Sequence, residues 1–215
     1  MVRGVALLSG GLDSGVAAAT FDAQPENALC AALFCDYGQR ALHQEARAAT
    51  ALARRLGAPL HRVELSWLAD LARRAGAALV DDAAPLPAAT PSAPGDEASA
   101  RAVWVPARNA VFVSVAASLA ETLGADCVVA GFNREEAATF PDNSRAFLDA
   151  ATAFLALGTQ GGLEVVSPTV DWDKERIVAE AVRLGFGPGD FWSCYDGGEA
   201  PCGRCESCVR SRFAR

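Results

Sequence analysis

Short apolar runs recur along the chain and alternate with longer segments that have helical spacing. We expect β-strands at residues 5–8, 28–37, 60–65, 125–132 and 163–168. Helices are expected between and after them, at residues 14–21, 41–58, 109–124 and 173–184. Strands and helices that alternate in this way predict an α/β fold with a doubly wound, mainly parallel five-stranded sheet covered by helices on both faces.

One long segment interrupts this alternation. Residues 81–100 read DDAAPLPAATPSAPGDEASA and are rich in proline, alanine and aspartate. Because clustered proline and turn residues disfavour regular structure, we expect a loop here. A loop of this length inside a compact domain is typical of a lid over a site or of a disordered segment.

Composition and charge exclude several classes of protein. With 215 residues, 51% hydrophobic and 21% charged, the chain resembles an ordinary water-soluble globular protein. It contains no stretch of about 18 uncharged apolar residues and no apolar leader, so we expect neither a membrane span nor export. The net charge of −7 argues against a broad nucleic-acid-binding surface. Lys174 is the only lysine and His43 and His61 are the only histidines, so a lysine nucleophile or a histidine-based triad is not expected.

Cysteine usage indicates the compartment. The seven cysteines form an odd set in a chain without an export signal. Such a set argues against a disulfide framework and favours a reducing, cytoplasmic location. Cys30, Cys35 and Cys127 fall within expected strands, where we interpret them as buried core thiols.

The sequence SGGLDS at residues 9–14 joins the first expected strand to the first expected helix. Gly10 and Gly11 let a ligand approach the backbone, and the free N–H groups at the start of a helix suit phosphate. Both the lysine-containing phosphate loop and the G-x-G-x-x-G dinucleotide pattern are absent. A carboxylate at Asp13 next to phosphates needs a bridging cation, which predicts Mg²⁺. The simpler alternative is a helix that Asp13 or Ser14 merely caps.

The C-terminal region contains a second motif. Cys194, Cys202, Cys205 and Cys208 follow the spacing C-x7-C-x2-C-x2-C. Four thiolates in a short segment that contains glycines can bind Zn²⁺ tetrahedrally and stabilise a segment with few apolar residues. An iron–sulfur cluster is the alternative, but the ferredoxin pattern would continue x3-C-P, whereas VRSR follows Cys208.

Three further segments place polar residues next to expected strand ends. CDYGQR (35–40) follows the second strand, WVPARN (104–109) precedes a helix, and GFNREEAATFPDN (131–143) follows the fourth strand. Each alone could be an ordinary turn. Because the carboxyl ends of parallel strands share one edge of the sheet, together they predict one pocket with the glycine loop. Arg108 in this pocket could bind a phosphate or a carboxylate.

SGGLDS looks like the pyrophosphate loop (PP-loop) of enzymes that adenylate a carboxyl or carbonyl oxygen and release pyrophosphate. Together with DYGQR, VPARN, FPDN and SCYDGGEAPCGRCESC, in this order, it resembles the QueC family of 7-cyano-7-deazaguanine synthases, over nearly the whole chain. The chain departs from the family at NREEAATFPDN, where many members have an acid and a stretch like SGYPDC.

The resemblance implies an adenine nucleotide alpha hydrolase-like domain at residues 1–190 with a zinc-binding tail at residues 191–215. It also implies an ATP-dependent ligase that converts 7-carboxy-7-deazaguanine and ammonia to the nitrile through an adenylated acid and an adenylated amide. Two ATP would give two AMP and two pyrophosphate. The implied cofactors are ATP, Mg²⁺ and Zn²⁺; the partners are a small-molecule substrate and ammonia, without nucleic acid or membrane, and the family's habit suggests a homodimer.

The resemblance also implies site residues. Catalytic roles fall to Asp13 and Arg108. The residues expected to bind ATP lie in and around the first three motifs: Leu8, Ser9, Gly10, Gly11, Leu12, Asp13, Ser14, Phe34, Tyr37, Gly38, Gln39, Arg108 and Asn109. Candidates for substrate binding come from the fourth segment: Gly131, Asn133, Glu135, Glu136, Phe140 and Asp142. The metal ligands are the four C-terminal cysteines.

Three other functions share some of these features. A tRNA-thiolating enzyme also uses such a loop and cysteines, but it usually needs an RNA-binding surface that this acidic chain leaves little room for. An amide-forming relative would stop after one activation. A non-enzymatic zinc-binding interaction module would leave the intact SGGLDS without a role.

Overall fold

The computed structural model describes residues 1–88 and 97–210 of the chain. Its centre is a five-stranded sheet in the order β3-β2-β1-β4-β5, and every neighbouring pair is parallel. The strands are β1 (Val2–Leu7), β2 (Asn27–Asp36), β3 (Leu60–Glu64), β4 (Cys127–Val129) and β5 (Glu164–Val166). The predicted α/β fold with a five-stranded parallel sheet is confirmed.

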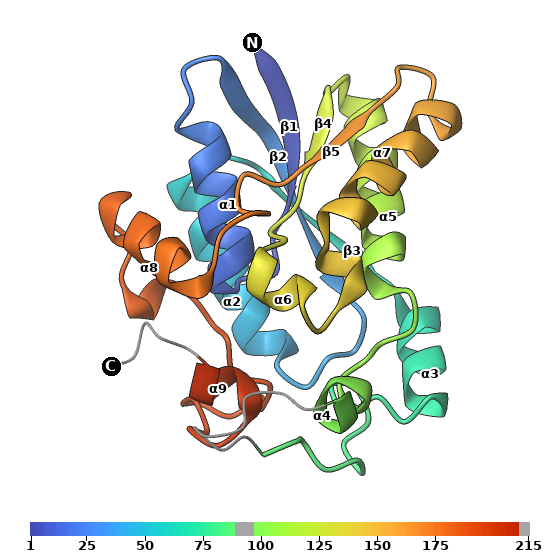
Figure 1. The fold of residues 1–215 in the computed structure, drawn as a ribbon, viewed down its shortest axis with the longest axis vertical. Coiled ribbons are helices and arrows are strands. Elements are labelled where there is room, and N and C mark those ends of the chain that lie inside the picture. Colours follow the sequence, from blue (N-terminus) through green and yellow to red (C-terminus); the bar gives the residue numbers. More distant parts are fainter. Residues whose placement is uncertain (89–96, 211–215) are drawn as a thin grey trace.

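Helices cover both faces of this sheet (Figure 1). One face carries α1 (Leu12–Asp22), α2 (Leu42–Arg55) and α8 (Lys174–Arg183), and the other carries α3 (Ser66–Arg74), α5 (Arg108–Leu123) and α7 (Arg145–Gly158). Shorter elements lie near the carboxyl ends of the strands: α4 (Glu97–Ala102), α6 (Arg134–Ala137), α9 (Glu206–Arg210) and two 3₁₀ turns, η1 (Pro141–Asn143) and η2 (Pro188–Asp190).

Two apolar cores result, one on each face of the sheet. Successive side chains of a strand point to opposite faces. Val5 and Leu33 therefore pack toward α5 and α7, whereas Ala6 and Phe34 pack toward α1, α2 and α8. All four are buried. A strand that is buried on both faces is apolar at nearly every position, which is why the strands were recognisable as continuous apolar runs.

The helix bounds follow the sequence expectations closely, and the strand bounds less so. Strand β4 has three residues where eight were expected, because only Cys127–Val129 pair with β1 and β5. Helix α7 was not expected. Its first turn is capped by the Ser144 hydroxyl, which accepts a hydrogen bond from the Phe147 N–H at 3.1 Å. Its buried face, Leu148 and Leu155 among others, has the usual helical spacing.

The segment 81–100 was expected to lack regular structure, and this is wrong for its last residues. Residues 97–100 begin helix α4, whose Glu97 and Arg101 form an ion pair one turn apart. Acidic residues near a helix start and such pairs stabilise a short helix. Residues 81–88 contain turns and an isolated bridge from Ala88 to Cys205. Residues 89–96 of this segment lie outside the described residues, so the expected lid or disorder over residues 81–100 stays a prediction.

None of the helices in the described part of the chain is both long enough and apolar enough to cross a membrane.

Candidate active site and cysteine cluster

A cavity of about 310 Å³ opens at the carboxyl ends of the strands. Its walls come from the PP-loop, the end of β2, the start of α5, the segment after β4, α8 and the C-terminal segment. Fifteen of the residues expected for ATP or substrate line it: Leu8, Ser9, Gly11, Leu12, Asp13, Ser14, Phe34, Tyr37, Gln39, Arg108, Asn109, Gly131, Glu136, Phe140 and Asp142. The structure therefore brings the separate polar segments to one site.

The PP-loop is held by its own hydroxyl groups. The Ser9 and Ser14 hydroxyls are 2.9 Å apart, and the Ser14 hydroxyl donates to the Gly11 carbonyl at 3.2 Å. Gly131, which follows β4, lies so close that a Cβ there would be 2.5 Å from the Ser14 Cα. Only glycine fits at this contact, so the loop is fixed against the neighbouring strand end.

Four expected residues do not line this cavity. Gly10 has φ +84° and its carbonyl accepts a hydrogen bond from the Trp192 N–H at 2.9 Å. Gly38 lines a separate cleft beside α2. Asn133 is fully buried and caps α6 by accepting from the Glu136 N–H at 3.0 Å. Glu135 accepts from the Lys174 backbone N–H at 3.1 Å. Gly10, Asn133 and Glu135 thus make contacts within segments that line the cavity, whereas Gly38 belongs to the separate cleft.

Lys174, for which no lysine chemistry was expected, extends into the cavity from the start of α8. Its ammonium pairs with the Asp13 carboxylate and lies 3.1 Å from the Glu136 carboxylate. Burial alone would lower the pKa of Lys174, but the two carboxylates outweigh it and the pKa is raised. Burial raises the pKa of Asp13, and the Lys174 ammonium counteracts this shift. The cavity therefore has a charged cluster at the PP-loop.

This cluster fits a divalent cation. The Asp13 Oδ1 atom is buried and has no hydrogen-bond partner within the described residues. Glu136 shares Lys174 with Asp13, so two carboxylates lie close together next to the phosphate loop. Carboxylate oxygens beside phosphate are the usual ligands of Mg²⁺.

A second buried cation in the cavity is Arg108. Its guanidinium donates to the Tyr37 hydroxyl at 3.2 Å and lies 5.7 Å from the centre of the Tyr37 ring. Burial acts against its charge, but Tyr37 and Asp142 outweigh this and the pKa of Arg108 stays above its usual value. Burial raises the pKa of Asp142, and the nearby Arg108 guanidinium offsets part of this shift. Arg108 is thus a buried, permanent cation in the cavity.

Two aromatic rings lie at the same end. The Trp104 and Phe140 rings are nearly parallel, with 12° between their planes and 6.4 Å between their centres. Both side chains line the cavity. Aromatic faces of this kind bind flat, conjugated ligands by stacking.

Sequence reasoning missed several other lining residues, among them Glu45, Trp104, Lys174, Tyr195 and Arg210. Trp104 and Tyr195 lay inside segments that were singled out, so proximity to a motif could have found them. Glu45 and Lys174 stand in the first turns of α2 and α8. A helix that follows a strand of a parallel sheet begins near the ligand-binding edge of the sheet. Polar residues in the first turn of such a helix could therefore have been predicted to lie near the site.

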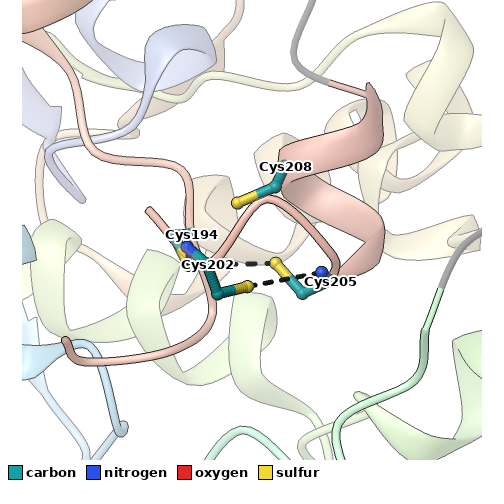
Figure 2. A group of neighbouring side chains, drawn as sticks. All are labelled: Cys194, Cys202, Cys205 and Cys208. Atoms are coloured by element: carbon teal, nitrogen blue, oxygen red, sulfur yellow. Dashed lines mark hydrogen bonds between the residues drawn. The ribbon is translucent and has the colours of Figure 1, made fainter. Parts of the chain in front are cut away.

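The four cysteines come together around the start of α9, the helix that contains Cys208 (Figure 2). Their sulfur atoms all lie within 4.8 Å of one another. The Cys202 N–H donates to the Cys194 Sγ at 3.3 Å, and the Cys205 N–H donates to the Cys202 Sγ at 3.4 Å. Four thiolates gathered in this way form a candidate site for one metal ion, as expected.

Comparisons with known proteins show the family to which the chain belongs. A family profile described as "Queuosine biosynthesis protein QueC" matches residues 3–214. The chain is 44% identical over 214 residues to the 7-cyano-7-deazaguanine synthase of Desulforudis audaxviator. This match covers 100% of this chain and 96% of that protein. It is 39% identical over 216 residues to the enzyme of the same description from Methanosarcina mazei, covering 97% of this chain and 91% of that protein.

Among solved structures, the U34-tRNA thiolase NcsA from Methanococcus maripaludis with its 4Fe-4S cluster is similar in fold. Its TM-score is 0.52 at 15% identity, over 87% of this chain and 58% of the thiolase chain. At this identity the likeness concerns the fold alone, and the chain spans only that part of the thiolase. The family, in contrast, is shown by the match over nearly the full length: the chain belongs to the QueC family.

Proposed function

We propose that the chain is an ATP-dependent 7-cyano-7-deazaguanine synthase of queuosine-type biosynthesis, which converts 7-carboxy-7-deazaguanine and ammonia to the nitrile. Membership of the QueC family carries this activity. The structural observation that supports it is the cavity that both the PP-loop and the buried Arg108 line. A phosphate-binding loop and a fixed cation in one pocket suit the joining of ATP to a carboxylate.

The chemistry requires activation because a carboxylate resists attack by ammonia. Transfer of AMP to the carboxylate oxygen makes AMP the leaving group, and ammonia then displaces it to give the amide. A second ATP activates the amide oxygen, and loss of AMP leaves the nitrile. The protein supplies positioning and charge neutralisation rather than a covalent nucleophile.

The ATP phosphates are assigned to the PP-loop. Backbone N–H groups at the start of α1 and the Ser9 and Ser14 hydroxyls are available to the leaving pyrophosphate. Lys174 adds a positive charge there once phosphate competes for its contacts with Asp13 and Glu136. Asp13 and Glu136 are the residues that would hold Mg²⁺, which neutralises phosphate charge when bound.

The deazaguanine is assigned to the part of the cavity lined by Trp104, Arg108 and Phe140. Trp104 and Phe140 offer faces for the flat base, and Arg108 is positioned for the carboxylate. Asp142, partly buried beside them, can accept hydrogen bonds from the N–H groups of a guanine-like edge.

The cysteine cluster is proposed to bind Zn²⁺. The segment that contains it also brings Trp192, Ser193 and Tyr195 to the cavity wall. A metal ion there would therefore stabilise one side of the active site as well as the tail itself.

We further propose a cytoplasmic homodimer. Helix α7 leaves two large apolar side chains in solvent, Phe154 at 60% and Leu157 at 93% exposure. Light scattering of the purified protein measures the mass directly, and a doubly substituted F154K/L157K variant tests whether these side chains form the contact.

The test of function uses the purified protein with ATP, Mg²⁺, ammonium and 7-carboxy-7-deazaguanine. Product mass and nucleotide are measured in the same reaction. Nitrile with about two AMP per product is the expected result, because each of the two activation steps consumes one ATP. Amide with about one AMP per product would identify a single-step enzyme, and absence of AMP would contradict the proposed substrate.

A further inference from the structure

Glu45 is a cavity residue to which none of the roles above has been given. It lies in the first turn of α2, and its carboxylate lines the same cavity as the PP-loop and Arg108. Its backbone carbonyl packs directly against Gly10, where a Cβ would collide with it. Glu45 is therefore in contact with the PP-loop through its backbone and lines the same cavity as Arg108.

The surroundings of this carboxylate keep it available as a base. The Gln39 side-chain amide donates to Glu45 Oε2 at 2.9 Å and to the Cys35 carbonyl at 3.2 Å, which fixes its position. No ion pair with Glu45 occurs within the described residues. Burial raises the pKa of Glu45 to about 7, although Gln39 and Arg108 act in the opposite direction. A base is most effective when its pKa lies near the working pH.

Nitrile formation needs a proton acceptor. The nitrogen enters as ammonia with three N–H bonds and ends in the nitrile with none. One proton must leave when the amide forms, and two more must leave when the amide becomes the nitrile. This requirement, like the inference itself, depends on the proposed function.

The other ionisable groups of the cavity are less suited to accept that proton. Asp13 and Glu136 already form ion pairs with the Lys174 ammonium, so either carboxylate would have to give up that contact to receive a proton. Burial raises the pKa values of Tyr37 and Tyr195, so both phenols stay protonated.

Asp142 is the remaining carboxylate. It accepts a hydrogen bond from the Asn143 side chain at 3.2 Å and lies within the influence of Arg108. Neither histidine of the chain lines the cavity. Glu45 and Asp142 thus both lack an ion pair within the described residues, but Asp142 is assigned to the guanine-like edge, whereas the backbone of Glu45 packs against Gly10 of the PP-loop.

We propose that Glu45 is the general base that accepts the proton from ammonia during amide formation. The lone pair of ammonia forms a C–N bond to the carbonyl carbon of the adenylated acid. The C–O bond to AMP breaks, AMP leaves with that electron pair, and one proton passes from nitrogen to the Glu45 carboxylate. The adenylated acid, ammonia and the Glu45 carboxylate thus give the amide, AMP and protonated Glu45, and no further reactant is needed.

The test separates adenylation from amide formation in the wild-type enzyme and a Glu45→Gln variant. Adenylation is followed as exchange of labelled pyrophosphate into ATP, which requires the acid but not ammonia. Amide and nitrile are measured with ammonium present. The glutamine variant should keep exchange within about threefold of wild type, whereas amide formation should fall by about 100-fold, as expected for loss of a general base.

Two controls sharpen the result. Arg108→Gln should lower exchange and amide formation together, because it affects acid binding, so the ratio of the two rates should not change. In Glu45→Ala, added formate should restore part of the amide formation, which a purely structural role for Glu45 would not allow. Exchange by the Glu45 variants also shows that they are folded.

An unchanged ratio of amide formation to exchange in Glu45→Gln would overturn the proposal. If both rates fell equally, the carboxylate would serve ATP or acid binding; if neither fell, it would have no role in either step. Failure of formate to restore Glu45→Ala would also count against a base. Absence of exchange in the wild-type enzyme would instead contradict the proposed function.

Discussion

The PP-loop and the cysteine cluster are both short motifs beside the cavity, yet they are held in place differently. The loop joins β1 to α1 and lies at the edge of a core that includes Leu8, Leu12 and Val16, with Gly131 packed against it. The cysteine cluster lies in a much smaller group of buried residues, Ala41, Trp192, Cys194 and Cys205.

This difference indicates where each motif obtains its shape. The sheet and its helices fix the loop whether or not a ligand is bound. The C-terminal segment buries too few apolar side chains to offset the entropy of ordering its backbone, so a bound metal must supply much of its stability. Substitutions should therefore unfold the second region and only inactivate the first.

The largest effect is expected for Cys205→Ser. Loss of one buried thiolate should abolish stoichiometric zinc and release the segment that holds Trp192 and Tyr195 against the cavity. Turnover should fall by about 1,000-fold or more, because removing a structural metal removes folding free energy of the order of 10 kcal/mol from that segment.

Metal content by elemental analysis and protease sensitivity of the C-terminal segment measure this. Cys30→Ser is the matched control, because Cys30 lies outside the cluster and its thiol donates to the Gly4 carbonyl. Full zinc content in Cys205→Ser, or iron in place of zinc in the wild-type protein, would contradict the proposed zinc site.

Asp13→Asn should inactivate without unfolding. The amide keeps the shape of the side chain but removes the charge that faces the phosphates, and loss of one such electrostatic group costs about 10²–10³-fold in turnover. Lys174 keeps Glu136 as its partner, so the fold should remain.

Pyrophosphate exchange at varied Mg²⁺ and thermal unfolding are the paired measurements. If Asp13→Asn unfolds the protein as readily as Cys205→Ser does, the contrast between the two regions is lost. Near-normal exchange would remove Asp13 from the site.

The same contrast explains which parts could be predicted from sequence. The loop and the cysteines are local motifs, so their residues and spacing sufficed. Strands buried on both faces leave continuous apolar runs, which made the sheet predictable. Lys174, by contrast, is distant in sequence from Asp13, and only the folding of α8 against the strand ends brings it to the cavity. Glu45 is close in sequence to its partner Gln39, but it meets Gly10 and lines the cavity only because α2 packs next to the PP-loop.

A smaller effect is expected for Trp104→Ala. Loss of one stacking face for a flat base costs about 1–3 kcal/mol, which corresponds to roughly 5–150-fold in affinity. The KM for 7-carboxy-7-deazaguanine should rise, whereas the KM for ATP should change little because the PP-loop is untouched. Phe140→Ala should behave in the same way. Equal changes in both KM values would show that Trp104 only maintains the shape of the wall.

The smallest effect concerns backbone strain at Ala107, which directly precedes Arg108 at the start of α5. Ala107 has φ +52° and is the only non-glycine residue with positive φ in the described chain, whereas the PP-loop has glycine at its positive-φ position, Gly10. A left-handed alanine costs about 1–2 kcal/mol, which glycine avoids. Glycine loses more conformational entropy on folding, however, and this offsets about 0.5–1 kcal/mol of the gain. Ala107→Gly should therefore raise the free energy of unfolding in urea by about 0.5–1 kcal/mol, and Gly10→Ala should lower it. If Ala107→Gly instead lowers the free energy of unfolding, the backbone at Ala107 is not strained and does not differ in this respect from the backbone at Gly10.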